Sequence, residues 1–302
     1  MMAMGAWTAA GLYLALAVGI ASAATFFGSR GNGRRAVPQA FGRLFELVEE
    51  RRTFMGLGPI VATARTHPWV LIIVVFASAP TVAAVVVAAA GAPLSVGDLV
   101  GSLALWRSVD GTQAFITYAV IGVVHAAVCW WYLRLNRAAI ASGAAPTTAV
   151  LRGRSRADVA GRLAVGAVLD EGGTLEELGW RAFLLPLLLV ELDRGPATLT
   201  LAVLWWAWHL PREVATIRRK GLTRTWIGQQ SIFLGVCIGL SVLCTEVVLR
   251  TGSVWPAILV HGGTNVWSKA LGGVPNSRWN TDVRTIIVAL IALPIAVMWV
   301  IG

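Results

Sequence analysis

Long apolar runs separated by arginine-rich segments constrain this chain more than any other feature. A helix of about 20 apolar residues spans a bilayer. Lipid offers no hydrogen-bond partners, so each crossing must satisfy its own backbone groups as an α-helix. One further crossing, over 161–190, has an irregular pattern. Regular crossings are predicted at 6–27, 68–90, 113–133, 197–210, 228–249, 255–271 and 283–301.

Composition supports the same fold class. Hydrophobic residues make up 57% of the 302 residues, charged residues make up 13%, and the mean hydropathy is +0.71. Soluble domains carry about 25% charged residues. We therefore predict an all-α, polytopic transmembrane bundle of about eight helices. It forms one integral membrane domain over residues 1–302.

The formal charge of +10 comes from arginines that lie between the apolar runs. Nucleic-acid binding would require them on one folded face, interleaved with stacking aromatic residues. Their positions instead follow the positive-inside rule, which predicts the lipid bilayer as a partner and no nucleic acid. The loop charges alternate as eight crossings with both termini outside require. In the basic segment 28–67, residues 40–52 could form an amphipathic helix on the inner leaflet or an ordinary solvated helix.

The irregular segment changes character halfway along. An apolar run ends at Leu169, and Asp170, Glu171, Gly172 and Gly173 follow it. The pattern predicts one long or broken helix that is interrupted near the two glycines. Asp170 and Glu171 would then cap the break or face water.

Ionisable residues inside a membrane segment are costly, so they are functional candidates. Glu177 and Arg181 are four residues apart, share a helix face and can pair. Glu176 lies about 100° around the helix from Glu177 and points elsewhere. A structural ion pair at a helix end would explain Glu177 and Arg181, but it does not explain why a second acidic residue, Glu176, lies in a membrane segment.

Two later segments carry polar residues of complementary chemistry. His209 follows three tryptophans near a helix end, where an interface residue is the more ordinary interpretation. His261 and Asn265 lie at i and i+4, so they project from one face. That pair can hold helices together by hydrogen bonds. It can equally direct donors at a developing oxyanion.

Taken together, three motifs resemble one family. The runs EELGWRAFLLP, WWAWHLP and HGGTN are similar, in that order, to the signature motifs of the CPBP family. These are Abi-like intramembrane proteases related to the CAAX prenyl endopeptidases of the Ras-converting-enzyme type. The resemblance implies an eight-helix core whose motifs lie on separate transmembrane helices. It covers roughly residues 163–267, within a motif-bearing core at 161–271.

The resemblance also implies roles for the matching residues. Glu176 corresponds to the catalytic glutamate, which activates water together with His209. Glu177 and Arg181 correspond to supporting residues, and His261 and Asn265 to the pair that stabilises the oxyanion. The family usually has phenylalanine at position 205, where Trp205 keeps an aromatic wall. Glycine is common at position 182, where this chain has alanine.

The implied activity is hydrolysis of a peptide bond in a membrane-associated peptide or protein. Glu176, His209 and His261 would form a plausible zinc set, but the His-Glu-x-x-His spacing is missing and a metal-free site is favoured. His209 lies near Arg212 at a predicted cytoplasmic helix end, so the site should open towards the cytoplasm. The high Ala, Val, Arg and Gly content favours a bacterial plasma membrane. An ion-coupled transporter and a non-catalytic scaffold or immunity protein remain alternatives.

Overall fold

Helices make up all the regular secondary structure in the described part of the chain. The computed structural model describes residues 4–30, 56–135, 155–214, 217–218, 221–271 and 278–301. The all-α prediction is confirmed over these ranges. The predicted amphipathic segment 40–52 falls outside them.

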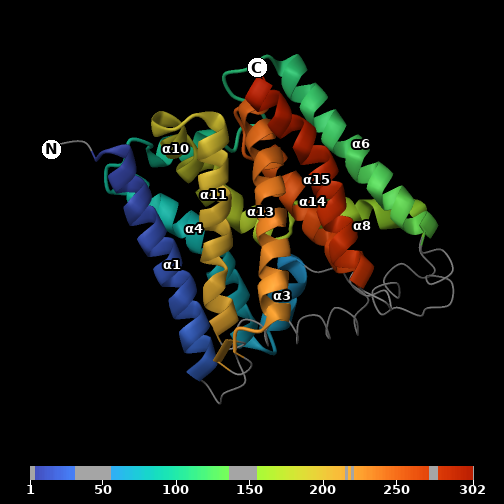
Figure 1. Ribbon diagram of the computed structural model, residues 1–302, viewed down its shortest axis with the longest axis horizontal. Helices are drawn as coiled ribbons and strands as arrows, with labels where there is room; N and C mark the ends of the chain where they lie inside the picture. Colours follow the sequence, from blue (N-terminus) through green and yellow to red (C-terminus); the bar gives the residue numbers. More distant parts are fainter. Residues whose placement is uncertain are drawn as a thin grey trace.

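Four of the described helices are long and apolar enough to cross a membrane, judged by length and composition. They confirm the predicted crossings near 6–27, 68–90, 113–133 and 228–249, whereas the count of about eight is not established. Figure 1 shows both chain termini towards the same side of the bundle. The four are α1 (Ala6–Arg30), the turn Pro68–Leu71 with α4 (Ile72–Ala89), α6 (Gly111–Leu135) and α13 (Arg224–Thr251).

The remaining helices are shorter or carry a shorter apolar part. Those at 197–210, 255–271 and 283–301 form where the pattern predicted helices. The two short helices α3 and α5 lie in segments that the sequence pattern assigned to loops. The bounds are α3 (Leu57–Ala64), α5 (Val96–Gly101), α11 (Arg194–Trp208), α14 (Trp255–Leu271) and α15 (Arg278–Ile301).

The irregular segment is a broken helix, and the break lies close to the two glycines, as predicted. It lies at Leu169 and Asp170, between α8 and α9. Asp170 is the N-cap of α9 and accepts a hydrogen bond from Gly173 N at 2.9 Å, which satisfies one of the orphan donors of a helix start. The helical elements of the irregular segment are α8 (Arg156–Val168), α9 (Glu171–Glu177), a π-helical stretch (Leu178–Leu184) and α10 (Leu185–Glu191).

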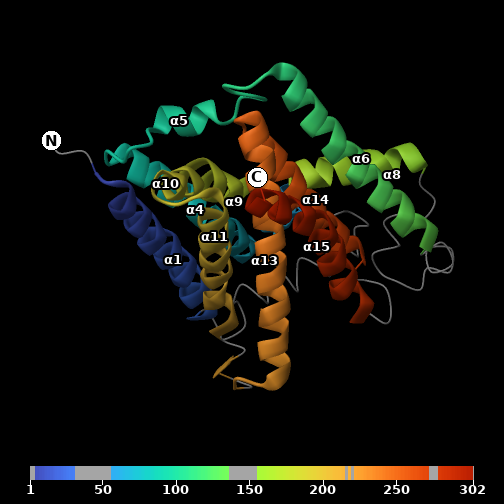
Figure 2. The ribbon, with the colours of Figure 1, turned by 45° about the horizontal axis from the view of Figure 1, so that its top comes forward.

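Gly172 and Gly173 lie inside α9, where the absence of a side chain permits close packing against α14. A Cβ added at Gly173 would lie 2.7 Å from Gly262 N and 2.9 Å from Ile258 O, both on α14. On its other side α9 contacts α4, where Thr81 Oγ1 donates to Leu175 O at 2.6 Å. Figure 2 shows α9 between α4 and α14. The glycines therefore bring the first motif against the helix that carries the third.

Gly173→Ala is expected to lower thermal stability, because the new methyl group forces α9 away from the α14 backbone. The midpoint of thermal unfolding in detergent measures this effect. Gly235→Ala is the matched control, since a Cβ there meets nothing within 4 Å. The control should keep or slightly raise the midpoint, because alanine is the better helix former. Equal midpoints for the two variants would contradict the tight α9–α14 contact.

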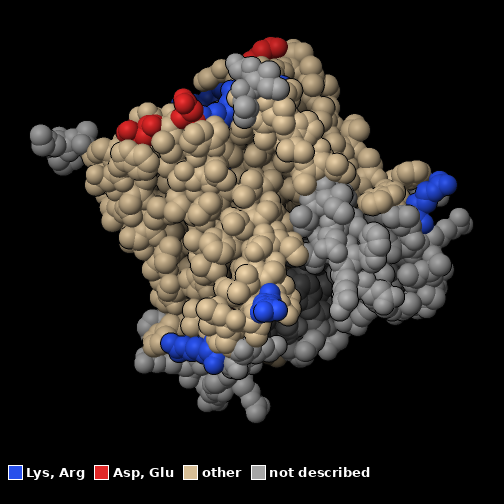
Figure 3. Space-filling view, viewed as in Figure 1, with Lys and Arg blue, Asp and Glu red and all other residues tan. Residues whose placement is uncertain are grey.

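The outer surface fits a lipid environment. In Figure 3, acidic side chains lie at the top of the visible face, basic ones lie at the top, the bottom and the right edge, and a broad uncharged surface lies between. On α6, Phe115, Ile116, Val120 and Val123 are all more than half exposed. Exposed apolar residues of this kind are stable in hydrocarbon and costly in water.

Candidate active site

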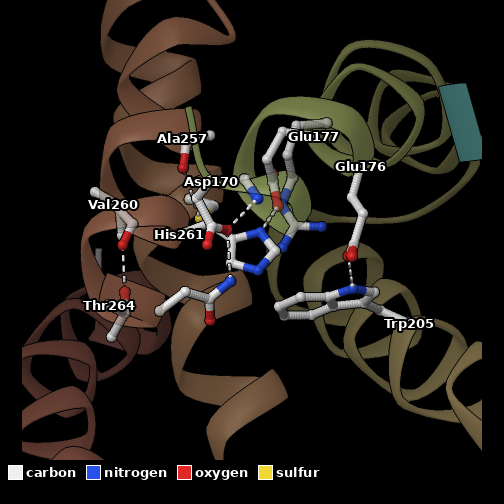
Figure 4. Close-up of polar contacts among 12 residues, drawn as sticks. Asp170, Glu176, Glu177, Trp205, Ala257, Val260, His261 and Thr264 are labelled. Atoms are coloured by element: carbon white, nitrogen blue, oxygen red, sulfur yellow. Dashed lines mark hydrogen bonds and ion pairs between the residues drawn. The ribbon is translucent and has the colours of Figure 1, made fainter. Parts of the chain in front are cut away.

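The three motifs predicted from the sequence meet in one place. Glu176 and Glu177 come from α9, Trp205 and His209 from the end of α11, and His261 and Asn265 from α14. Figure 4 shows the carboxylates of α9 directed towards the side chains of the other two helices. Residues far apart in the chain therefore form a single polar cluster inside an apolar bundle.

Glu176 points away from the Glu177–Arg181 pair, as the helix geometry predicted. Its side chain is buried, and Oε2 accepts a hydrogen bond from the indole Nε1 of Trp205 at 2.9 Å. The sequence analysis assigned Trp205 only the role of an aromatic wall. That prediction was incomplete, because the indole N–H directly contacts the candidate catalytic carboxylate.

Glu177 has two partners, the guanidinium of Arg181 and the imidazole of His261. Its Oε2 forms the predicted ion pair with Arg181 Nε at 3.3 Å, and both side chains are fully buried. Its Oε1 lies 2.8 Å from Nδ1 of His261. Arg181 also donates to Ser241 Oγ at 3.3 Å. Glu177 thus links the first motif to the third.

His209 is an interior residue and not an interface residue. Its ring lies among Trp208, Trp205 and Phe233, with centroid distances of 4.7, 5.8 and 5.0 Å. Nδ1 lies 2.8 Å from the carbonyl oxygen of Trp205. A carbonyl only accepts, so Nδ1 carries the proton, and Nε2 of the neutral ring keeps its lone pair. This tautomer can accept a proton at Nε2.

His261 and Asn265 share a face of α14, and each contacts a carboxylate at one end of α9. Glu177 holds Nδ1 of His261, and Asp170 Oδ2 accepts from Asn265 Nδ2 at 2.8 Å. A Cβ added at Gly172 would lie 3.2 Å from His261 Nε2 and 3.0 Å from Asn265 Nδ2. Any side chain at this position would crowd both nitrogen atoms, so glycine lets the backbone of α9 pass close to them.

Asp170 is the residue that the sequence analysis underrated. It was expected to cap the helix or face water, but it is completely buried and does more than cap. One oxygen, Oδ2, accepts from both Gly173 N and Asn265 Nδ2. The sequence did carry a signal for this role, because Asp170 is a charged residue directly after an apolar run within a predicted crossing. It pointed to a function for Asp170 as strongly as it did for Glu176.

Asp170→Ser separates these two contacts. Serine is a good N-cap and keeps the acceptor for Gly173 N, but its hydroxyl is too short to reach Asn265. We expect an unfolding midpoint close to that of the wild type and a fall in cleavage rate of about 10-fold. Thermal unfolding and initial rates measured on the same preparation check this. A wild-type rate would show that Asn265 needs no help from Asp170.

The described residues do not assemble the zinc set that the sequence left open. Among them, no group of three or more His, Cys, Asp or Glu side chains is placed to hold one metal ion. Two members of the set have other partners, since Glu176 accepts from Trp205 and His261 Nδ1 contacts Glu177. Glu176, the one carboxylate of the set, and its neighbour Glu177 are instead hydrogen-bond acceptors.

Comparison with known families agrees with the resemblance. Residues 162–267 match the family described as Type II CAAX prenyl endopeptidase Rce1-like. The match covers about a third of the chain and includes all three motifs, from Glu176 to Asn265. No curated protein sequence matches the chain. The resemblance read from the three motifs is therefore confirmed at the level of the family.

Proposed function

We propose that this chain, an integral membrane protein whose residues 162–267 form an Rce1-like domain, hydrolyses a peptide bond within or beside the bilayer. The observation that carries the proposal is the placement of Glu176 and His209. Trp205 contacts both, through its indole N–H and its carbonyl oxygen. A carboxylate and an imidazole held in this way can activate one water molecule.

In the proposed reaction, Glu176 accepts a proton from water while the oxygen attacks the carbonyl carbon of the substrate. The C–O bond forms, and the carbonyl oxygen becomes an oxyanion. When the tetrahedral intermediate collapses, the C–N bond breaks and the leaving nitrogen takes the proton held by Glu176, directly or after its transfer to His209. Nε2 of His209 is the atom that can carry this proton, because Nδ1 is bound to the Trp205 carbonyl.

His261 and Asn265 are proposed as the oxyanion donors. Both have a nitrogen atom close to Gly172, where the backbone of α9 carries no side chain. With Nδ1–H directed at Glu177, His261 donates through Nε2 only when the ring carries a second proton. The Glu177 carboxylate would stabilise that imidazolium at 2.8 Å. Donors fixed before reaction need no reorganisation when the charge develops.

The proposed steps use no metal ion, and the corresponding prediction concerns metal removal. A zinc chelator is expected to leave the cleavage rate of the purified protein unchanged. Initial rates before and after dialysis against the chelator, with a zinc peptidase as a positive control, give the measurement. A loss of activity that added zinc restores would instead assign Glu176, His209 and His261 as ligands.

The substrate is proposed to be a membrane-associated peptide or protein. The site is proposed to open towards the cytoplasm of a bacterial cell, because Arg212 lies three residues after His209 and basic residues mark that side. A C-terminal lipidated motif is the substrate type that the family name suggests.

Comparing the new N- and C-terminal ends of membrane proteins tests the function in cells. Cells that express the wild type are compared with cells that express Glu176→Ala at the same level. Peptide ends present only with the wild type would support the endopeptidase and identify its substrate. Identical sets of ends would contradict it. Proton-coupled uptake in proteoliposomes without such ends would favour a transporter.

A further inference from the structure

The side chain of Trp205 occupies the centre of the polar cluster. It is 2% exposed, and its ring centroid lies 5.0 Å from that of His261 and 5.8 Å from that of His209. The guanidinium carbon of Arg181 lies 5.2 Å from the same ring. This indole therefore touches side chains from all three motifs.

The contact between Trp205 and Glu176 is directional. An indole N–H only donates, so the carboxylate must lie along that bond to accept it. The 2.9 Å distance is that of a well-formed hydrogen bond, and the low-polarity surroundings strengthen it. Without this contact, rotation about the side-chain bonds of Glu176 would let the carboxylate leave the position from which it reaches water.

The backbone of the same residue holds His209. Its carbonyl oxygen lies 2.8 Å from Nδ1, one helical turn further along α11. Trp205 thus sets the relative positions of the two groups that would share the proton. A phenylalanine, which the family usually has here, would provide the ring and the carbonyl but no donor for Glu176.

We propose that Trp205 is a positioning residue that aligns Glu176 with His209 through its indole N–H. The inference rests on the proposed endopeptidase function and gives the aromatic residue of the second motif a hydrogen-bonding role in addition to its ring. Its action is on the chemical step, because the indole holds the carboxylate and need not contact the substrate.

The decisive test replaces Trp205 by benzothienylalanine, in which sulfur stands where the indole has N–H. This keeps the bicyclic shape and removes only the donor. We expect kcat to fall by about 10-fold or more with little change in KM, since a hydrogen bond to a charged group is lost. Trp205→Phe should behave in the same way. Trp206→Phe, the same change one position along α11, should keep the wild-type kcat.

An activity-independent measurement separates this inference from the proposed function. The NMR resonance of the Trp205 indole N–H, identified by its loss in Trp205→Phe, should shift when Glu176 is replaced by Gln, and that of Trp206 should not. A wild-type kcat in the benzothienylalanine variant overturns the inference and leaves the endopeptidase standing. A Trp205 indole N–H resonance that does not shift in Glu176→Gln also overturns the inference. If the wild-type protein cleaves no membrane protein or peptide, the endopeptidase function is contradicted and the inference fails with it.

Discussion

Glu176→Gln is expected to lower the rate of peptide-bond cleavage by about 10³-fold or more while the protein still inserts and folds. The amide keeps the size of the side chain and can still accept the hydrogen bond from Trp205 Nε1 through its carbonyl oxygen. It cannot take a proton from water. The reaction then depends on His209 alone, which lacks the carboxylate partner of the proposed pair.

Initial rates on a purified protein and a substrate found by the search for new peptide ends would measure this effect. Glu171→Gln is the matched control, because it removes a buried carboxylate from the same helix that is not one of the groups proposed to carry the proton. The control should keep most of the activity. If Glu176→Gln and Glu171→Gln are equally active, Glu176 is not the group that activates water.

The sequence predicted residue types and their grouping better than it predicted their partners. Apolar length defined the long helices, and spacing of four residues paired Glu177 with Arg181, because both properties are local. The contact of Glu177 with His261 joins residues 84 positions apart. No single helix pattern encodes such a contact, so the sequence left open whether His261 holds helices together, donates to an oxyanion or binds a metal.

Asp170 and Trp205 show where the prediction failed. The glycines suggested a helix break, since glycine weakens helices. The break does lie close to them, at Leu169 and Asp170, but the glycines also let α9 approach α14, which the pattern did not predict. For Trp205 the resemblance implied only an aromatic wall. The packing of α11 against α9 instead buries Trp205 and gives its N–H a carboxylate partner. Both corrections depend on tertiary contacts between helices.

Glu177→Met is expected to cost about 3–5 kcal/mol of stability, the range found when one partner of a buried ion pair is removed. Arg181 would keep its charge with no exposed surface, and its contacts with the Ser241 hydroxyl and the Trp205 ring are both neutral. Thermal unfolding in detergent measures the effect. Arg162→Met is the matched control, because the Asp158–Arg162 pair has the same spacing but is more than a third exposed. It should cost less than about 1 kcal/mol.

The double variant Glu177→Met/Arg181→Met distinguishes a folding role from a catalytic one. Removing both charges leaves apolar side chains of similar length, so most of the lost stability should return. Activity should stay low, because His261 no longer has a carboxylate at Nδ1 to support its protonated form. A stable and fully active double variant would show that Glu177 serves only to neutralise Arg181. A stable but inactive one would place Glu177 in the chain of contacts that prepares His261 for the oxyanion.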